Sequence, residues 1–263
     1  MAQTLAEIRE ALKAANRAEY EALARALAAD ERKGVKAALK SAARRLAAED
    51  AEAARLEGMY SFQAKLAGGG IAVGLDEVGR GPVAGPLAIG AVVLPDDPRV
   101  EDVNDSKQLS AERREEIAAV VREVAIAWDI EYIQPQEIDE HGMTWALRTA
   151  NLRAIAAIEE QLSAKGASLD AVLLDGNAQH LDAREVNIVK GDGKCASIAA
   201  ASIIAKVDRD ALMCRYAERF PHYGFESNKG YASAEHIEAI KQYGLSSVHR
   251  ASFCRAWTQE TLF

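Results

Sequence analysis

The sequence predicts a mixed α/β domain preceded by a helical extension, and three observations support this organisation. Residues 4–66 lack proline and are rich in Ala, Leu, Glu, Lys and Arg, which are strong helix formers. Beyond residue 70, short runs of Val, Ile and Leu alternate with segments that have helical spacing. Gly68-Gly69-Gly70 lies between the two parts and is typical of a flexible junction. We therefore expect a helical extension over residues 1–68 and a larger α/β domain over residues 69–263.

The extension is expected to form two or three helices that are interrupted near residues 29–34, because apolar residues recur at three- and four-residue spacing. Residues 1–68 contain 12 Lys+Arg and 10 Asp+Glu, a slightly positive balance. Two roles stay open for this part. It is either an appended helical arm with a solvated charged face or a contact to nucleic acid. The second role would use four of its cations, Arg32, Lys33, Lys36 and Lys40.

The domain is expected to contain five strands and at least four helices. The strands are predicted at residues 71–75, 87–94, 124–133, 171–174 and 186–189. The helices are predicted at residues 110–122, 144–164, 197–217 and 234–243. Little helix separates the first three strands, which favours an antiparallel meander, whereas later strands alternate with helices, which favours parallel additions. The first half of the third helix is almost entirely Ala and Ile, so we expect it to be buried.

Composition limits the classes of function. The net charge of −8 argues against a protein that coats nucleic acid through charge alone, although acids that bind metal would account for part of it. The three cysteines have no metal-ligand spacing and indicate a reducing compartment. No signal peptide is recognisable, and no apolar run reaches the ~18 residues of a membrane span. We expect a soluble, cytoplasmic protein without membrane contact.

Four carboxylates lie at or just beyond the ends of three predicted strands. They are Asp76, Glu77, Asp175 and Asp192. Ligands bind at this edge of open α/β sheets, and crowded carboxylates repel one another unless a cation lies between them. Neighbouring strand residues point to opposite faces, so Asp76 and Glu77 share a site only if the strand end bends. The pattern favours a site for hard divalent metals over ordinary acidic turns.

Residues 71–255 closely resemble ribonuclease HII, the bacterial type 2 ribonuclease H. The motifs that carry the resemblance occur in the family's order and are GLDEVGRGPVAGPL at 74–87, NDSKQLS at 104–110, LLDG at 173–176, KGDGKCASIAAASIIAKVDRD at 190–210, NKGYAS at 228–233 and HRASF at 249–253. The resemblance implies an α/β fold with a ribonuclease H-like core, a five-stranded mixed sheet flanked by helices. Two departures are Cys195, in place of a small hydroxyl residue, and Asn228, in place of a frequent histidine.

The resemblance also implies the chemistry. The family's metal-binding and catalytic acids fall on Asp76, Glu77, Asp175 and Asp192, which would hold two Mn²⁺ or Mg²⁺ ions. The expected substrates are RNA/DNA hybrids and duplex DNA that contains ribonucleotides. Incision on the 5′ side of a ribonucleotide would leave a 3′-hydroxyl and a 5′-phosphate and would serve DNA repair and primer removal. We expect a monomer.

Further residues are assigned to the substrate by the resemblance. Gly79, Arg80 and Gly81 would read the 2′-hydroxyl, and Tyr231 would stack on the next deoxyribose, although a half-buried core tyrosine is the alternative. Candidate phosphate contacts are Asn104, Ser106, Lys107, Lys194 and Ser197. Ser197 alternatively caps the buried helix.

Three other functions are considered. His249 and Ser252 are close in sequence, but we expect packing near the C-terminus rather than a nucleophilic pair. A ribonuclease HIII-like enzyme would share the core and prefer longer RNA tracts, but the extension lacks the strand alternation expected of that class. A non-catalytic nucleic-acid-binding protein on a nuclease-like core is disfavoured, because all four acids are present.

Overall fold

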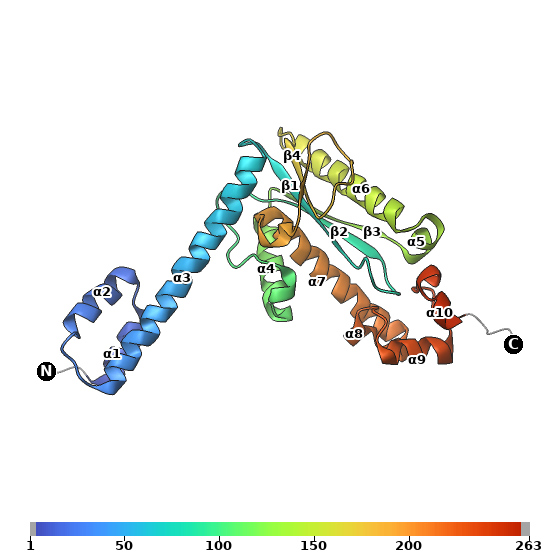
Figure 1. Cartoon of the computed structure of the whole chain (residues 1–263). Coiled ribbons are helices and arrows are strands. Elements are labelled where there is room, and N and C mark those ends of the chain that lie inside the picture. Colours follow the sequence, from blue (N-terminus) through green and yellow to red (C-terminus); the bar gives the residue numbers. More distant parts are fainter. Residues whose placement is uncertain (1–3, 259–263) are drawn as a thin grey trace. The chain divides into compact units, whose positions relative to one another are not determined.

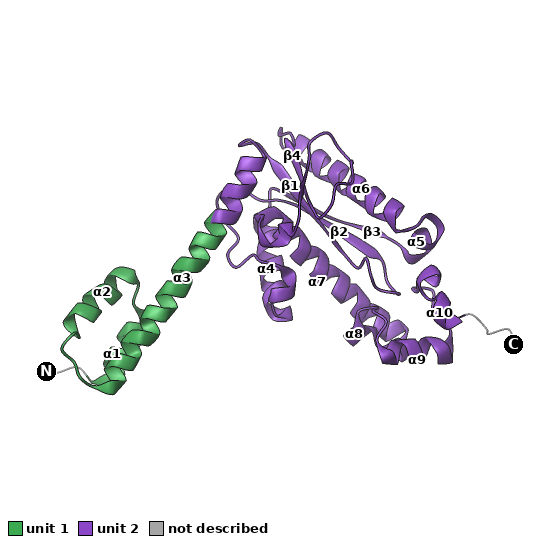
Figure 2. Ribbon diagram, viewed as in Figure 1, with its two compact units in different colours: residues 1–57 green, residues 58–263 purple. Residues whose placement is uncertain are grey.

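A computed structural model of the chain describes residues 4–258 and contains two compact units, residues 1–57 and residues 58–263 (Figure 2). The boundary falls within one long helix, α3 (Lys33–Leu66), so its last turns belong to the second unit. The division expected near residue 68 lies just after the end of the same helix.

The N-terminal unit consists of α1 (Leu5–Ala14), α2 (Arg17–Ala26) and the first part of α3. Thr4 and Asn16 begin the first two helices, and each forms a capping box with a glutamate three residues later. The unit has a small apolar core of its own, formed by Ile8, Leu12, Val35 and Ala42. The chain between α2 and α3 contains the expected interruption.

The second unit is built on a five-stranded mixed sheet with the order β3-β2-β1-β4-β5 (Figure 1). The strands are β1 (Ala72–Val78), β2 (Leu87–Val93), β3 (Ala127–Ile133), β4 (Ala171–Asp175) and β5 (Glu185–Ile188). β2 pairs antiparallel with both β1 and β3, whereas β4 pairs parallel with both β1 and β5. The expected meander with parallel additions is therefore confirmed.

Helices cover both faces of this sheet. They are α4 (Ala111–Val124), α5 (Pro135–His141), α6 (Met143–Ser163), α7 (Ala196–Arg219), α8 (Phe225–Asn228), α9 (Ala234–Tyr243) and α10 (Arg255–Thr258). The first half of α7 is buried against β1 and β2, as its composition predicts. Gly74 and Gly90 permit this contact, because a Cβ atom at either position would lie within 2.3 Å of the α7 backbone. Across residues 4–258, no helix has the length and apolar character needed to span a bilayer.

Two strand boundaries differ from the sequence prediction by three residues, and the others agree to within one. The strand expected from residue 124 begins at Ala127, because α4 extends through Val124. The first strand does not end at Leu75 but continues to Val78. The continuation is stabilised from one side only: β2 pairs as far as Val78 with Ala88, whereas pairing with β4 ends at Leu75 with Leu174. The two acids that follow Leu75 consequently lie within the strand.

Candidate active site

Asp76 and Glu77 lie where β1 has lost its β4 neighbour. They project to opposite faces of the strand, as alternation requires. The Asp76 carboxylate is turned toward α7, where the Ser202 hydroxyl lies close enough to favour its charged form, while Glu77 lines a pocket with Leu147 of α6. The strand does not need the bend expected from the sequence, because the end of β4 at Asp175 opens the edge to both side chains.

Asp175 and Asp192 are brought to the same edge by the ends of β4 and β5. Asp175 is the last residue of β4, and its Oδ1 accepts the N–H of Gly191 at 2.6 Å. Asp192 follows in the 3-10 turn Gly191–Gly193, where it is buried. A hydrogen bond between the two loops therefore holds two of the predicted ligands at fixed positions.

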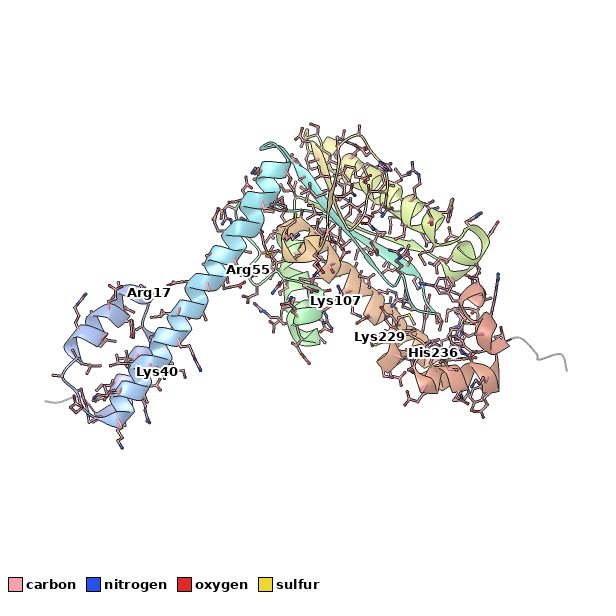
Figure 3. The ribbon with its side chains drawn as sticks, viewed as in Figure 1. Arg17, Lys40, Arg55, Lys107, Lys229 and His236 are labelled. Atoms are coloured by element: carbon pink, nitrogen blue, oxygen red, sulfur yellow. The ribbon has the colours of Figure 1, made fainter. Side chains whose placement is uncertain are left out.

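A pocket of about 380 Å³ joins most of the predicted site. Three of the acids line it, together with six of the predicted substrate-binding residues, Gly79, Arg80, Gly81, Ser106, Lys107 and Tyr231. The fourth acid, Asp192, is connected to the pocket by Lys107, whose Nζ lies 3.4 Å from Asp192 Oδ2. Lys107 is labelled in Figure 3. The fold thus gathers residues that are more than 150 positions apart in the sequence.

Burial and mutual repulsion disfavour negative charge in this pocket. Burial raises the pKa of Asp76 to about 7; the Ser202 hydroxyl opposes this rise, and the carboxylates of Asp175 and Glu77 add to it. Burial likewise raises the pKa of Glu77 and of Asp175 above their ordinary values. A bound cation would remove both the repulsion and part of the cost of burial.

The donor set fits a hard divalent cation. All four side chains offer carboxylate oxygens, which suit Mg²⁺ and Mn²⁺. Protein donors contact these oxygens: Arg80 lies 3.4 Å from Glu77, and Lys107 approaches Asp192 at the same distance. Within residues 4–258, no three metal-ligating side chains converge on a single point.

Two buried arginines hold the Gly79-Arg80-Gly81 loop. Arg250 donates to the carbonyl oxygens of Gly79 at 2.6 Å and of Arg80 at 3.0 Å. Arg209 also lies against the loop, so that a Cβ atom at Gly79 would be 2.1 Å from its Nε. Gly79 also has a φ of +87°, which favours glycine. The loop is fixed through its own backbone carbonyls, and the Arg80 side chain stays exposed.

Tyr231 lies beside this loop with its side chain 52% exposed. Its ring approaches Gly81, where a Cβ atom would be 3.8 Å from Tyr231 Cε1. The Tyr231 carbonyl is hydrogen-bonded to His236 Nδ1 at 2.7 Å, and His236 is in turn bonded to His249 at 3.0 Å between Nε2 atoms. The backbone is therefore anchored while the side chain lines the pocket, and its stacking on a deoxyribose stays a prediction.

Three of the predicted phosphate contacts, Ser197, Asn104 and Lys194, do not line this pocket. Ser197 is completely buried, and its N–H donates to Gln63, so the side chain has no path to a substrate phosphate. It is not the helix cap either, because α7 begins after Cys195. Asn104 and Lys194 do not line the pocket; they bond to the Asp105 N–H and to the Val189 carbonyl. Ser106 remains at the pocket with its hydroxyl 3.0 Å from that of Ser202.

Three polar residues that line the pocket were not predicted from the sequence: Arg114, Ser202 and Lys206. Ser202 and Lys206 are four residues apart on α7, so they share one helix face. A polar pair at this spacing in a helix dominated by Ala and Ile is the signal that identifies them. Arg114 gives no comparable signal, because it lies among other charged residues of α4.

The histidine and serine of the HRASF motif do not form a nucleophilic pair. His249 Nδ1 accepts the Ser246 N–H, whereas Ser252 binds Asp139. Burial lowers the pKa of His249 to about 4, so the ring is neutral at pH 7. The expected packing role agrees with these contacts.

Comparisons with known proteins match both parts of the chain. The family model described as ribonuclease HII matches residues 73–256, and the model described as the ribonuclease HII N-terminal domain matches residues 4–67. A ribonuclease HII of Ruminiclostridium cellulolyticum is 42% identical over 212 residues, covering 80% of this chain and 81% of the relative.

Solved structures show the same fold. The ribonuclease H2 from Pyrococcus horikoshii OT3 is similar with a TM-score of 0.59 and 27% identity, covering 71% of this chain and 96% of that chain. A ribonuclease HIII, named Bst-RNase HIII and solved in complex with Mn²⁺, gives a TM-score of 0.58 at 20% identity, covering 73% of this chain and 71% of that chain. The ribonuclease H-like fold with an N-terminal helical domain is therefore confirmed.

Proposed function

The chain belongs to the ribonuclease HII family, and from this premise we propose that it hydrolyses the RNA strand of RNA/DNA hybrids and incises duplex DNA on the 5′ side of single embedded ribonucleotides. The products would carry a 3′-hydroxyl and a 5′-phosphate. In the cell this activity would serve ribonucleotide excision repair and the removal of RNA primers. We further propose that the enzyme acts as a cytoplasmic monomer; its three free cysteines are consistent with a reducing compartment.

One observation carries the proposal: four carboxylates surround one sheet edge, and burial raises the pKa of three of them. Asp76, Glu77, Asp175 and Asp192 would hold Mn²⁺ or Mg²⁺. When bound, a metal pair activates water and stabilises the leaving oxygen of a phosphodiester. No protein nucleophile is needed for this reaction, which agrees with the separate hydrogen-bond partners of His249 and Ser252.

Ribose recognition is assigned to the Gly79-Arg80-Gly81 loop and Tyr231. Arg250 already bonds to the carbonyls of Gly79 and Arg80, so a 2′-hydroxyl would be read by loop amides or by the exposed Arg80 guanidinium. Tyr231 lies next to Gly81 and would stack on the sugar of the following deoxyribonucleotide. Lys107, Arg114 and Lys206 line the same pocket and are the cations available to substrate phosphates.

The decisive experiment is cleavage of a DNA duplex that contains one ribonucleotide, with Mn²⁺, with Mg²⁺ and with a chelator. We expect metal-dependent incision on the 5′ side of the ribonucleotide and no cleavage of the matching all-DNA duplex. A strong preference for long RNA tracts would instead indicate ribonuclease HIII-like behaviour. Binding without cleavage under every metal condition would indicate a non-catalytic protein and would reject the proposal.

A further inference from the structure

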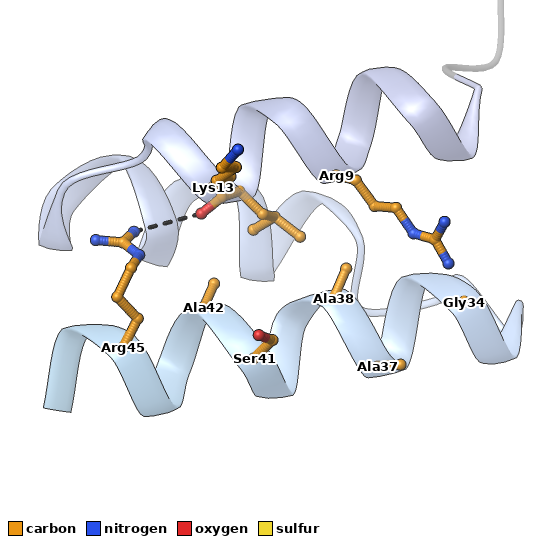
Figure 4. Close-up of a pocket in the computed structure, with 9 residues that line it drawn as sticks. Arg9, Lys13, Gly34, Ala37, Ala38, Ser41, Ala42 and Arg45 are labelled. Atoms are coloured by element: carbon orange, nitrogen blue, oxygen red, sulfur yellow. Dashed lines mark hydrogen bonds between the residues drawn. The ribbon is translucent and has the colours of Figure 1, made fainter. Parts of the chain in front are cut away.

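The N-terminal unit has a pocket of its own, about 380 Å³ in volume, between α1 and α3 (Figure 4). Arg9 and Lys13 of α1 and Arg45 of α3 line it, and small side chains such as Ala37 and Ser41 form its α3 wall. No Asp or Glu of the described chain lines this pocket. The pocket is therefore an open, cation-lined depression with a wall that a large ligand can approach closely.

The sequence of α3 extends the positive charge beyond the pocket. Residues 33–48 contain five cations and no acid. Of these cations, Lys33, Lys40 and Arg44 share a helix face with Ala37 and Ser41, because their spacing follows the helical repeat. Lys40 and Arg44 are four residues apart, about 6 Å along the helix axis, and so are Arg9 and Lys13.

Ion pairing separates the cations of this unit into two groups. Lys36 pairs with Glu31 at 2.5 Å, Arg32 pairs with Asp30 at 2.6 Å, and Arg45 pairs with Glu49 at 2.7 Å.

The second group has no carboxylate within ion-pairing distance among residues 4–258, and its side chains are exposed. Apart from Arg25 of α2, this group consists of Arg9, Lys13, Lys33, Lys40 and Arg44 of α1 and α3, which we call the basic face. Two of the four cations first considered for a nucleic-acid contact, Arg32 and Lys36, are thus already neutralised by neighbouring acids.

We propose that the basic face binds the phosphodiester backbone of a nucleic-acid duplex without sequence preference. Exposed cations with no paired acid release counterions when they meet phosphates, and this release drives such binding. The small side chains between the cations let the backbone approach the helix. Residues 4–57 expose no large apolar side chain, so the surface lacks the apolar anchors that protein interfaces use. A polyanion therefore fits this face better than a protein partner does.

The proposal depends on the proposed function in one respect: the proposed function defines which kind of duplex the enzyme encounters. It adds a second contact, in the N-terminal unit, to the pocket that contains the carboxylates. Its chemical role is affinity and not catalysis, because the basic face contains no group that acts on a phosphodiester. Neutralising the basic face should weaken binding most at low salt and least at high salt.

Two matched double variants of the full-length chain test this. Lys40→Gln/Arg44→Gln removes two charges from the basic face, while Arg17→Gln/Lys36→Gln removes two charges that are ion-paired with Asp50 and Glu31. Binding to a labelled duplex of about 20 base pairs is measured with a chelator present, between about 50 and 200 mM salt. We expect the slope of log K against log salt to become shallower by about 2 in the first variant, at about 0.9 per lost phosphate contact, and to stay unchanged in the second.

Two results would overturn the proposal. If both slopes change equally, net charge alone explains the effect; if neither slope changes, the basic face does not contact the duplex. A changed oligomeric state with an unchanged slope would also overturn it and would identify the face as a protein contact. Failure of the proposed function would appear separately, as absence of metal-dependent cleavage by the unmodified chain, since the slopes are measured without metal.

Discussion

The carboxylates of the β1 edge and those around the β4–β5 loop are in opposite electrostatic environments. In the loop, Arg184 pairs with Asp182 at 2.7 Å and with Glu159 at 2.6 Å, and the first of these hydrogen bonds lowers the pKa of Asp182 to about 2. At the β1 edge, burial raises the pKa of Asp76 to about 7, and neighbouring acids reinforce the rise. An ionised aspartate thus stabilises the fold at Asp182 and destabilises it at Asp76.

The difference indicates where the fold depends on something outside the chain. An acid that is paired with arginine is satisfied by the protein, whereas acids that are buried together need a cation that the protein does not supply. Such unsatisfied groups are a mark of functional sites. Four variants test this difference between the two environments.

The largest effect is expected on the stability of the metal-free protein. Asp76 in the folded protein retains its proton up to about pH 7, whereas the unfolded chain loses it near 3.8. Stability should therefore fall as pH rises through this window, by about 4 kcal/mol at most. Asp76→Asn should remove this part of the fall and leave the variant more stable than the parent at pH 8. Denaturant unfolding in a chelator at pH 5 and pH 8 measures both, and a variant that is less stable at each pH would contradict the assignment.

The next effect concerns turnover. Asp192→Asn should reduce cleavage at least ~100-fold, the scale of losing a preorganised electrostatic group, with the fold intact by circular dichroism. Asp182→Asn is the matched control, because it removes an acid of the same kind outside the pocket. Similar rates for the two variants would remove Asp192 from the active site.

Asp182→Asn should in turn affect stability with the opposite pH dependence to Asp76→Asn. The pKa of Asp182 is below its unfolded value, so its contribution is present above about pH 4 and is lost as pH falls toward 2. The substitution should cost about 2 kcal/mol at pH 7 and almost nothing near pH 2. Thermal unfolding across this range measures the difference, and a constant cost at every pH would show that charge is not involved.

The smallest effect is expected on specificity. Tyr231→Ala should reduce cleavage at a single embedded ribonucleotide about tenfold more than cleavage along an all-RNA strand, because stacking on one residue contributes roughly 1–3 kcal/mol. Tyr243 has a side chain of similar exposure in α9 and does not line the pocket, so Tyr243→Ala is the control. Equal losses on both substrates would assign Tyr231 to packing.

Local pattern predicted much of this architecture. The strand and helix order and the buried half of α7 follow from apolar periodicity, and the gathering of acids near one sheet edge follows from their positions after apolar runs. The length of β1 does not, because it depends on β2 continuing to pair after β4 has ended. Such a boundary is a property of the neighbouring strands and leaves no mark in the strand itself.

The burial of polar residues was the other feature that could not be predicted from the sequence. Ser197 looks like a phosphate contact in its motif, but the close approach of α7 to Gly74 covers it. Arg209 and Arg250 are among the most buried side chains, yet charged residues are expected at the surface. Only the fold reveals the backbone carbonyls that satisfy them.

The last turns of α3 restrict how an extension of this kind can be exchanged between relatives during evolution. Tyr60 Oη accepts the N–H of Val100, and Gln63 Oε1 accepts the N–H of Ser197 at the start of α7. Both residues lie in the N-terminal family segment but in the compact unit of the catalytic domain. If a recombination joint lay at Gly68-Gly69-Gly70, the residues that accept these two N–H groups would come from another protein. Viable chimaeras should therefore be joined near Glu57, within the helix.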